Sequence, residues 1–469
     1  MKQLITTLLL ACTAYSVGYT QQKATLMGKI SNSVTDTINF ANESPAYFFG
    51  EMGRQIILDK EGRFKLELAL HTAPVQFSLY LGEQGKINCF LEPGQLLEVE
   101  ANANDLTRIR FNSKDPSAAN NTAMAAHSHL LADPDFQVNL YRDSTRTPES
   151  SAAVIDSATQ AELAYWNSKK GKISKAFYEN RKINTLALQA SLKSGFVSSY
   201  KKWHKNDGKQ LPADYLSFMQ QIPVLEATHL SSFENWRLIN LKIQYAASPD
   251  PNKNGRPAPM EQLLIADTLF HGAVREFALA DIVRMALLRE KDEQKMAALV
   301  TAYKSRINNK YYGAYIDKNF QTYLTLRNGK PAPDFKLQGI DGKEYQLSDF
   351  RNKVIYLDFW ASWCSPCRYQ MKNYAPALHE KFKGKDVVFL FVSVDDNKDK
   401  WKQAIEEDNI EGVHVISPDG NGKAFTKRYN ISGVPRYMII DKAGKMYNND
   451  APRPSDEITV VQLNQALKN

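Results

Sequence analysis

The sequence predicts a multidomain chain with an N-terminal all-β sandwich-like module, an α-helical middle region and a C-terminal α/β domain. Three patterns predict this fold class. Residues 24–111 alternate apolar and polar side chains, which is typical of strands with one buried face. From Ala161 to about Leu326, apolar residues recur at helical spacing. The remainder combines near-continuous apolar runs, typical of buried strands, with further helical patterns.

The composition is that of an ordinary globular protein. The chain has 469 residues, of which 43% are hydrophobic and 23% charged, and this length fits two to four domains. The net charge is +8, but no cluster of Lys and Arg stands out and no nucleic-acid-binding motif accompanies the charge. We therefore expect a solvated basic surface and no nucleic-acid partner.

Residues 1–20 have the pattern of an export signal peptide. Lys2 supplies the charged start, and the apolar run Leu4–Ala14 is too short to span a membrane as a mature helix. The segment Leu9–Cys12 also resembles a lipobox, although Leu10 is unusual there, so a lipid anchor at Cys12 stays open as an alternative. Export predicts a location in the periplasm or cell envelope, where disulfides can persist.

Residues 21–112 are predicted to form the β module. The turn Asp59–Gly62 predicts a hairpin leading into the strand Phe64–Leu70. Cys89 falls on another predicted strand, where a lone cysteine is expected to be a small buried apolar residue. The further predicted strands are Gln55–Leu58, Val75–Leu81, Ile87–Leu91 and Leu96–Glu100.

Residues 113–328 form the predicted helical region. After Asn112 the composition shifts toward Ala, Ser, Asn and Asp, which predicts a connector before the helices that start near Ala161. The segment Ser248–Gly255 predicts a loop. The histidines of this region share no spacing typical of metal ligands. Its aromatic residues are expected to form the helix-packing core; examples are Trp166, Trp203, Phe233, Trp236 and Tyr245.

The stretch Val354–Cys367 carries the most informative motif. It begins as a buried strand and ends in Cys364 and Cys367, which are separated by Ser-Pro and followed by a predicted helix to about Lys381. A helix N-terminus favours the thiolate of Cys364, and Cys367 lies one turn later, within reach of a disulfide. Because thiolates attack disulfides, the motif predicts redox exchange. The alternatives are half of a zinc site, for which no further ligand lies nearby, and a purely structural disulfide.

Four further motifs accompany the cysteine pair. They are the entry segment Gly329–Phe335, Asp358 six residues before Cys364, the tripeptide Gly433-Val434-Pro435, and Ala451–Ser455. With these motifs, residues 329–469 resemble the TlpA/ResA-like thiol-disulfide oxidoreductases of bacterial envelopes, which belong to the thioredoxin superfamily. The resemblance implies a thioredoxin fold. Residues Lys398–Asp408 also predict a helix before the Gly433-Val434-Pro435 loop, a feature that resembles TlpA/ResA domains more than minimal thioredoxin. The β module and the helical region are similar to those of Bacteroidetes-type members.

The resemblance also implies three catalytic residues. Cys364 and Cys367 would form the redox-active disulfide, with Cys367 the less exposed thiol. Asp358 matches the buried carboxylate of thioredoxin and would be the base that takes the proton of Cys367, since burial raises the pKa of a carboxyl group. A hydrogen-bonded structural carboxylate is the alternative for Asp358.

Substrate binding is implied for three other residues. Trp363 would shield one side of the disulfide, with core packing as the alternative. Pro435, if cis, would bring the backbone of Val434 against Cys364, where it could pair with a bound peptide. Two positions depart from the family pattern: Gln370 stands where ResA-like members commonly carry glutamate, and Arg436 stands where thioredoxins usually have threonine.

The leading interpretation is a reductase of disulfide-bearing envelope proteins that uses no cofactor. The resemblance implies a membrane thiol-reducing donor of the DsbD/CcdA type. Alternatives are an oxidase or isomerase of the DsbA/DsbC kind, a peroxiredoxin, and a chiefly non-catalytic binding module. Ser365-Pro366 is closer to the Gly-Pro of thioredoxin than to the Pro-His of DsbA, which favours reduction, and the chain lacks the peroxiredoxin cysteine motif.

Overall fold

The computed structural model describes residues 22–45, 49, 53–70, 73–127, 130–253, 255–417, 424–431 and 433–468. The predicted export signal, residues 1–20 with Cys12, lies outside them. The chain forms two compact units. The first runs to Val283 and includes Ala297–Tyr312, and the second consists of Arg284–Met296 and Gly313–Asn469.

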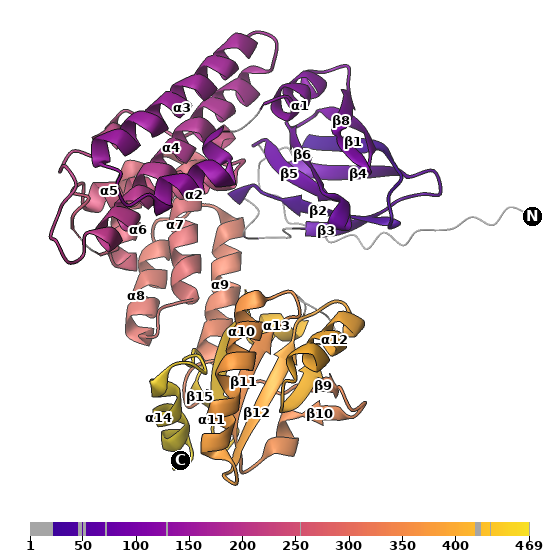
Figure 1. The fold of residues 1–469 in the computed structure, drawn as a ribbon, viewed down its shortest axis with the longest axis vertical. Helices are drawn as coiled ribbons and strands as arrows, with labels where there is room; N and C mark the ends of the chain where they lie inside the picture. The colour runs from indigo at the N-terminus through magenta and orange to yellow at the C-terminus, as the bar shows by residue number, and fades with distance from the viewer. Residues whose placement is uncertain are drawn as a thin grey trace, which may run out of the picture. The chain divides into compact units, whose positions relative to one another are not determined.

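The first unit begins with a sandwich of two four-stranded sheets, as the alternating pattern predicts (Figure 1). Apolar side chains from both sheets, such as Leu26 and Phe77, share one buried core. One sheet has the order β4-β1-β7-β8: Arg63–Leu70, Gln22–Ser31, Leu96–Asn102 and Asp105–Asn112. The other has the order β3-β2-β5-β6: Gly53–Ile57, Thr37–Asn42, Val75–Tyr80 and Lys86–Leu91.

The predicted hairpin at Asp59–Gly62 is wrong. The turn exists, because an Asp59 carboxylate oxygen accepts hydrogen bonds from the backbone N–H groups of Glu61 and Arg63 at 3.0 and 2.8 Å. However, β3 and β4 belong to different sheets, so the turn carries the chain across the sandwich. Cys89 on β6 is free and fully buried, as expected.

Nine helices follow among the described residues, in the region where helices are predicted. The predicted connector is wrong, because helices begin at Ser117. Thr147 caps α3 by accepting from the Ser150 N–H at 3.2 Å, and Pro148 starts that helix. The helices are α1 Ser117–Ala125, α2 Pro134–Arg142, α3 Pro148–Lys169, α4 Lys175–Trp203, α5 Phe233–Ala247, α6 Pro259–Leu269, α7 Gly272–Leu287, α8 Glu293–Lys304 and α9 Lys310–Thr325.

The aromatic core of this region is smaller than predicted. Trp166 is fully buried, and Trp203 packs partly buried against a core cluster. Phe233, the first residue of α5, is 41% exposed. The predicted loop at Ser248–Gly255 is confirmed for its described residues, which separate α5 from α6.

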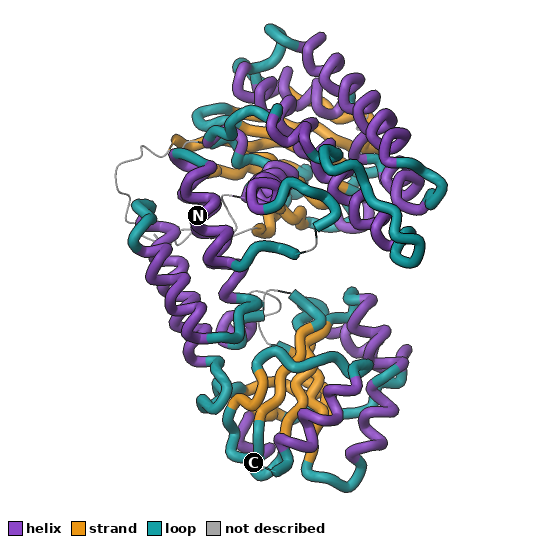
Figure 2. Tube along the Cα trace, turned by 90° about the vertical axis from the view of Figure 1, so that its left-hand side faces the viewer, coloured by secondary structure: helices purple, strands orange, loops and turns teal. Residues whose placement is uncertain are grey.

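The second unit contains a seven-stranded mixed sheet, ordered β10-β9-β13-β12-β11-β14-β15. The central strands β11, β12 and β13 are parallel, and β14 pairs antiparallel with β11. Figure 2 shows these strands side by side, as the thioredoxin fold requires. The strands are β9 Lys336–Gly339, β10 Glu344–Gln346, β11 Val354–Trp360, β12 Val387–Ser393, β13 Val413–Ile416, β14 Arg436–Ile440 and β15 Met446–Asn448.

Helices cover both faces of this sheet. Leu378 of α11 and Leu463 of α14 pack on the face that carries Tyr356, whereas Phe425 of α13 packs on the face that carries Leu357. Among the described residues, no helix is both long enough and apolar enough to cross a membrane. The helices are α10 Ser365–Asn373, α11 Ala375–Phe382, α12 Lys398–Asp408, α13 Ala424–Arg428 and α14 Glu457–Ala466.

The single helix predicted from Cys364 to about Lys381 is two helices. The break lies at Tyr374, whose φ of −124° is not helical. Pro376 explains it, because proline has no N–H to donate to Lys372 and its ring clashes with that carbonyl in a continuous helix. Only α10 therefore carries the cysteine pair.

Candidate redox site

The cysteine pair follows the C-terminal end of the central strand β11. All seven of its residues are buried, as expected for a run of apolar and aromatic side chains at the centre of a sheet. The chain leaves the sheet after Trp360, and Cys364 becomes the N-cap of α10, with Pro366 in the first turn. The pair therefore sits where strand ends and helix begins.

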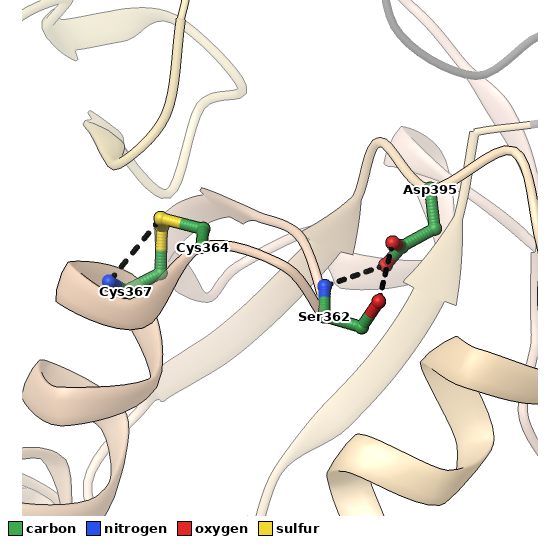
Figure 3. The surroundings of a disulfide bond; sticks show 4 residues. All are labelled: Ser362, Cys364, Cys367 and Asp395. Atoms are coloured by element: carbon green, nitrogen blue, oxygen red, sulfur yellow. Dashed lines mark hydrogen bonds between the residues drawn. A yellow bond between two sulfur atoms is a disulfide. The ribbon is translucent and has the colours of Figure 1, made fainter. Parts of the chain in front are cut away.

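Cys364 and Cys367 form a disulfide, with their Cα atoms 5.3 Å apart (Figure 3). The Cys367 backbone N–H donates to the Cys364 Sγ at 3.3 Å, in the manner of a helix cap. This N–H and the α10 dipole would stabilise a thiolate on Cys364 after reduction. Cys364 is 4% exposed and Cys367 is fully buried, so Cys364 is the more accessible sulfur.

A carboxylate that the sequence analysis missed anchors the loop before Cys364. Asp395 accepts from the Ser362 backbone N–H at 2.9 Å and from the Ser362 hydroxyl at 2.7 Å (Figure 3). The Ser393 hydroxyl donates to the same carboxylate at 2.7 Å. One signal was available: Asp395 follows β12, and the carboxyl ends of parallel strands meet at one edge of a sheet.

Asp358 lies in the middle of β11, and 1% of it is exposed. Among the described residues, none donates a hydrogen bond to either carboxylate oxygen. Burial raises the pKa of Asp358 well above its usual value. The absence of described donors argues against the alternative of a hydrogen-bonded structural carboxylate, and burial without donors makes the carboxylate more basic than an exposed one.

The structure brings the predicted peptide-binding residues to the disulfide. The Val434–Pro435 peptide bond is cis, and Val434 packs against the apolar cluster that contains both cysteines. Trp363, next to Cys364, is 62% exposed, so the alternative of core packing is wrong. The disulfide thus has an exposed indole on its own loop and the cis-proline loop among its packing neighbours.

The two departures from the family pattern have structural partners. Gln370 is buried on α10, and its Oε1 accepts from the Ser455 backbone N–H at 3.1 Å. Arg436 donates to the Asn449 carbonyl at 2.8 Å and pairs with Asp450. Burial lowers the pKa of Arg436, and Asp450 partly offsets this effect. Both residues fix the segment that follows β15.

Comparison with known proteins bears on the same part of the chain. The Redoxin family model matches residues 327–467. The thiol-disulfide oxidoreductase ResA of Bacillus thuringiensis is 30% identical over 153 residues, which cover 32% of this chain and 84% of the relative. The chain belongs to the TlpA/ResA-like thiol-disulfide oxidoreductases of the thioredoxin superfamily.

A second ResA relative and a solved structure are also similar to part of this chain. The ResA of Geobacillus kaustophilus is 33% identical over 135 residues, covering 29% of this chain and 75% of the relative. A crystal structure described as a thiol-disulfide oxidoreductase from Bacteroides vulgatus is 37% identical and covers 30% of this chain and 99% of that chain, with a TM-score of 0.29. As a TlpA/ResA-like protein, the chain is a thioredoxin-like oxidoreductase with a disulfide-capable pair, Cys364 and Cys367.

Proposed function

We propose that this protein reduces disulfides of partner proteins in the cell envelope. The observation that carries the proposal is the position of the Cys364 sulfur, which caps α10 and accepts the Cys367 N–H. A thiolate at this position is stabilised relative to a free thiol, and it is the species that attacks disulfides. Cys364 is the nucleophile and Cys367 the resolving thiol.

The reaction transfers two electrons to the partner. The Cys364 thiolate attacks one sulfur of the partner disulfide, and the other partner sulfur leaves as a thiolate that takes a proton. Cys367 loses its proton, and its thiolate attacks the Cys364 Sγ. The Cys364–Cys367 disulfide forms, and the second partner sulfur leaves and is protonated.

Asp358 is the proposed base for the second step. Its raised pKa brings the carboxyl group closer to that of a thiol, which makes proton exchange with Cys367 more nearly balanced. Gln370 cannot exchange a proton, so this task falls to Asp358. Partner peptides would pair with the backbone of Val434 beside cis Pro435, and the exposed indole of Trp363 would contact their apolar side chains.

The wider context is part of the proposal. Residues 1–20 would direct export, with Cys12 as a possible lipid-attachment site, and residues 329–469 would be the redox domain. Residues 21–112 and 113–328 would be the sandwich and helical domains. A membrane donor of the DsbD/CcdA type would regenerate the dithiol, as the family resemblance implies.

The reduction potential of the Cys364–Cys367 couple tests the direction of electron flow. We expect a value near that of thioredoxin, about −270 mV, when tryptophan fluorescence of the protein is followed in dithiothreitol or glutathione redox buffers. A value near that of DsbA, about −120 mV, would make the protein an oxidant and contradict the proposal. If Cys364 and Cys367 form no reversible redox couple, only a binding role would remain. Cys364→Ser is the redox-inactive control.

A further inference from the structure

Two buried polar groups that have no hydrogen-bond partner among the described residues lie opposite each other on strands β11 and β14. Asp358 is directly opposite Tyr437 in the antiparallel pair, so both side chains project from the same face of the sheet. Tyr437 is 3% exposed, and no described residue hydrogen-bonds its hydroxyl, just as none bonds the Asp358 carboxylate. Buried polar atoms are nearly always paired, so two neighbouring exceptions call for a bridging molecule or a function.

Tyr437 also borders an open hollow of about 450 Å³. We call it the β14 hollow; its lining includes Pro435, Arg436 and Tyr437, together with Arg453 and Asp456. The hollow is polar and large enough to hold water. Tyr437 is therefore the residue that contacts this hollow and also lies opposite Asp358.

The neighbouring tyrosine on the same face differs in one decisive respect. The rings of Tyr356 and Tyr437 stack with centroids 5.7 Å apart, and burial, together with the charge of the nearby Asp358, raises the pKa of each phenol. However, the Tyr356 hydroxyl donates to the Pro452 carbonyl at 2.7 Å. The Tyr356 proton is therefore held in a structural hydrogen bond. The Tyr437 hydroxyl has no hydrogen-bond partner among the described residues.

We propose that Tyr437 is a positioning residue that carries the proton of Asp358 to water in the β14 hollow. The inference rests on the proposed function, in which Asp358 takes the proton of Cys367. The Tyr437 hydroxyl, which is buried and not hydrogen-bonded to Asp358, accepts a proton from the Asp358 side through a bridging water, and its own proton leaves toward the hollow that the Tyr437 side chain lines. The phenol is unchanged at the end, and Asp358 returns to the carboxylate for the next turnover.

The charged groups around Tyr437 fit this role. Arg453 and Asp456 belong to the segment after β15 and act on the phenol in opposite directions, while burial and Asp358 both favour its neutral form. Because the phenol stays protonated at neutral pH, it can relay a proton in either direction without becoming charged. The path therefore serves both the reductive and the oxidative half-reaction.

The experiment separates the two chemical steps. Reduced protein is mixed with oxidised glutathione in a stopped-flow instrument. The second-order rate at low glutathione reports the attack by Cys364, and the rate at saturation reports closure of the disulfide by Cys367. We expect Tyr437→Phe to slow closure about tenfold, less than the 10²–10⁴-fold that positioned proton transfer can supply, and to leave the first step unchanged. Tyr356→Phe is the matched control and should leave both steps unchanged.

Asp358→Asn completes the test. If the hydroxyl acts through the carboxylate, the double variant Asp358→Asn/Tyr437→Phe closes no more slowly than Asp358→Asn alone. The solvent isotope effect and the pH profile of closure should change in Tyr437→Phe and not in Tyr356→Phe. The inference would be overturned if Tyr437→Phe closes the disulfide within twofold of the wild-type rate, or if it slows both steps equally. It would also be overturned if the rate losses of Asp358→Asn and Tyr437→Phe add up in the double variant. If wild-type protein itself forms no disulfide, the proposed function fails instead.

Discussion

At the scale of single residues, the geometry of the redox site depends on buried polar groups: Asp395 holds the loop before Cys364, and Asp358 and Tyr437 lie opposite each other on paired strands. The cysteines and Asp358 could be selected from the sequence because a CxxC after a buried strand and a charge inside that strand are unusual. Asp395 could be placed at the carboxyl edge of the sheet but not opposite Ser362, and Tyr437 could not be placed opposite Asp358, because both positions depend on strand register. Register is a tertiary property: β11 pairs with β12 and β14, which lie far from it in the chain.

Asp395 gives the first residue-scale prediction. Asp395→Ala removes the three side-chain hydrogen bonds that tie Ser362 and Ser393 together. We expect the free energy of unfolding of the second unit to fall by roughly 1–3 kcal/mol, the usual cost of stranding buried donors. Chemical denaturation of the oxidised protein measures this change.

The exposed neighbour Asp396 supplies the control. Asp396→Ala should leave stability within about 0.5 kcal/mol of wild type, as surface substitutions do. If Asp395→Ala is equally mild, the carboxylate does not anchor the loop before Cys364.

At the scale of elements, local rules succeeded where capping residues mark both ends of a helix, and failed where a proline interrupts a helical pattern or a polar composition hides the caps. The bounds of α12 agree with the predicted Lys398–Asp408, because Asn397 caps its start and Asn409 ends it in the left-handed conformation. The Pro376 break and the early helices from Ser117 were missed. In the latter case the polar composition hid the capping signals at Asp133 and Thr147.

The packing of α11 on the sheet predicts sensitivity to acid. His379 of α11 lies 4.0 Å from the ring of Phe389, and His414 of β13 stacks at 4.9 Å on Phe391. Burial lowers the pKa of each imidazole to about 4. In the unfolded chain the pKa is about 6.5, so the unfolded state binds protons first as pH falls.

The stabilisation from these neutral imidazoles is therefore complete above about pH 6.5 and is lost as pH falls toward 4. We expect hydrogen exchange of β12 and β13 amides to accelerate over this range. In His414→Phe, which keeps an aromatic ring without a titrating group, the acceleration should be smaller. The exposed His271→Gln serves as control, and an unchanged pH profile in His414→Phe would refute the assignment.

At the scale of the whole molecule, the three predicted kinds of structure are present, but the division between sandwich and helices is not a division between compact units. The sandwich and the helix α4 share a buried network. The Arg181 guanidinium donates to Gln76 of β5 at 2.6 Å and to Asn180 at 2.7 Å, and it lies 5.3 Å from the ring of Phe177. No periodic pattern could predict this network, because it joins residues about a hundred positions apart.

The network predicts that the sandwich and the adjoining helices unfold together. Arg181→Ala should lower the free energy of unfolding of the first unit by at least about 2 kcal/mol, because it strands buried partners and leaves a cavity. The Cys364–Cys367 potential should not change. Calorimetry measures the unfolding and redox titration the potential, and Arg110→Ala, at an exposed position, is the control. A shifted potential, or an unchanged free energy of unfolding of the first unit, would contradict the prediction.

The burial of Cys89 has a practical consequence for finding the physiological substrate. Apart from the redox pair, it is the only cysteine in the described residues, and burial raises the pKa of its thiol far out of the reactive range. In a Cys367→Ser variant, Cys364 would be the only reactive thiol of the folded domains, and its mixed disulfide could not be resolved from within. Such a variant would trap substrates as stable mixed disulfides. A protein that co-purifies with the folded domains under non-reducing conditions and is released by reductant would be bound through Cys364.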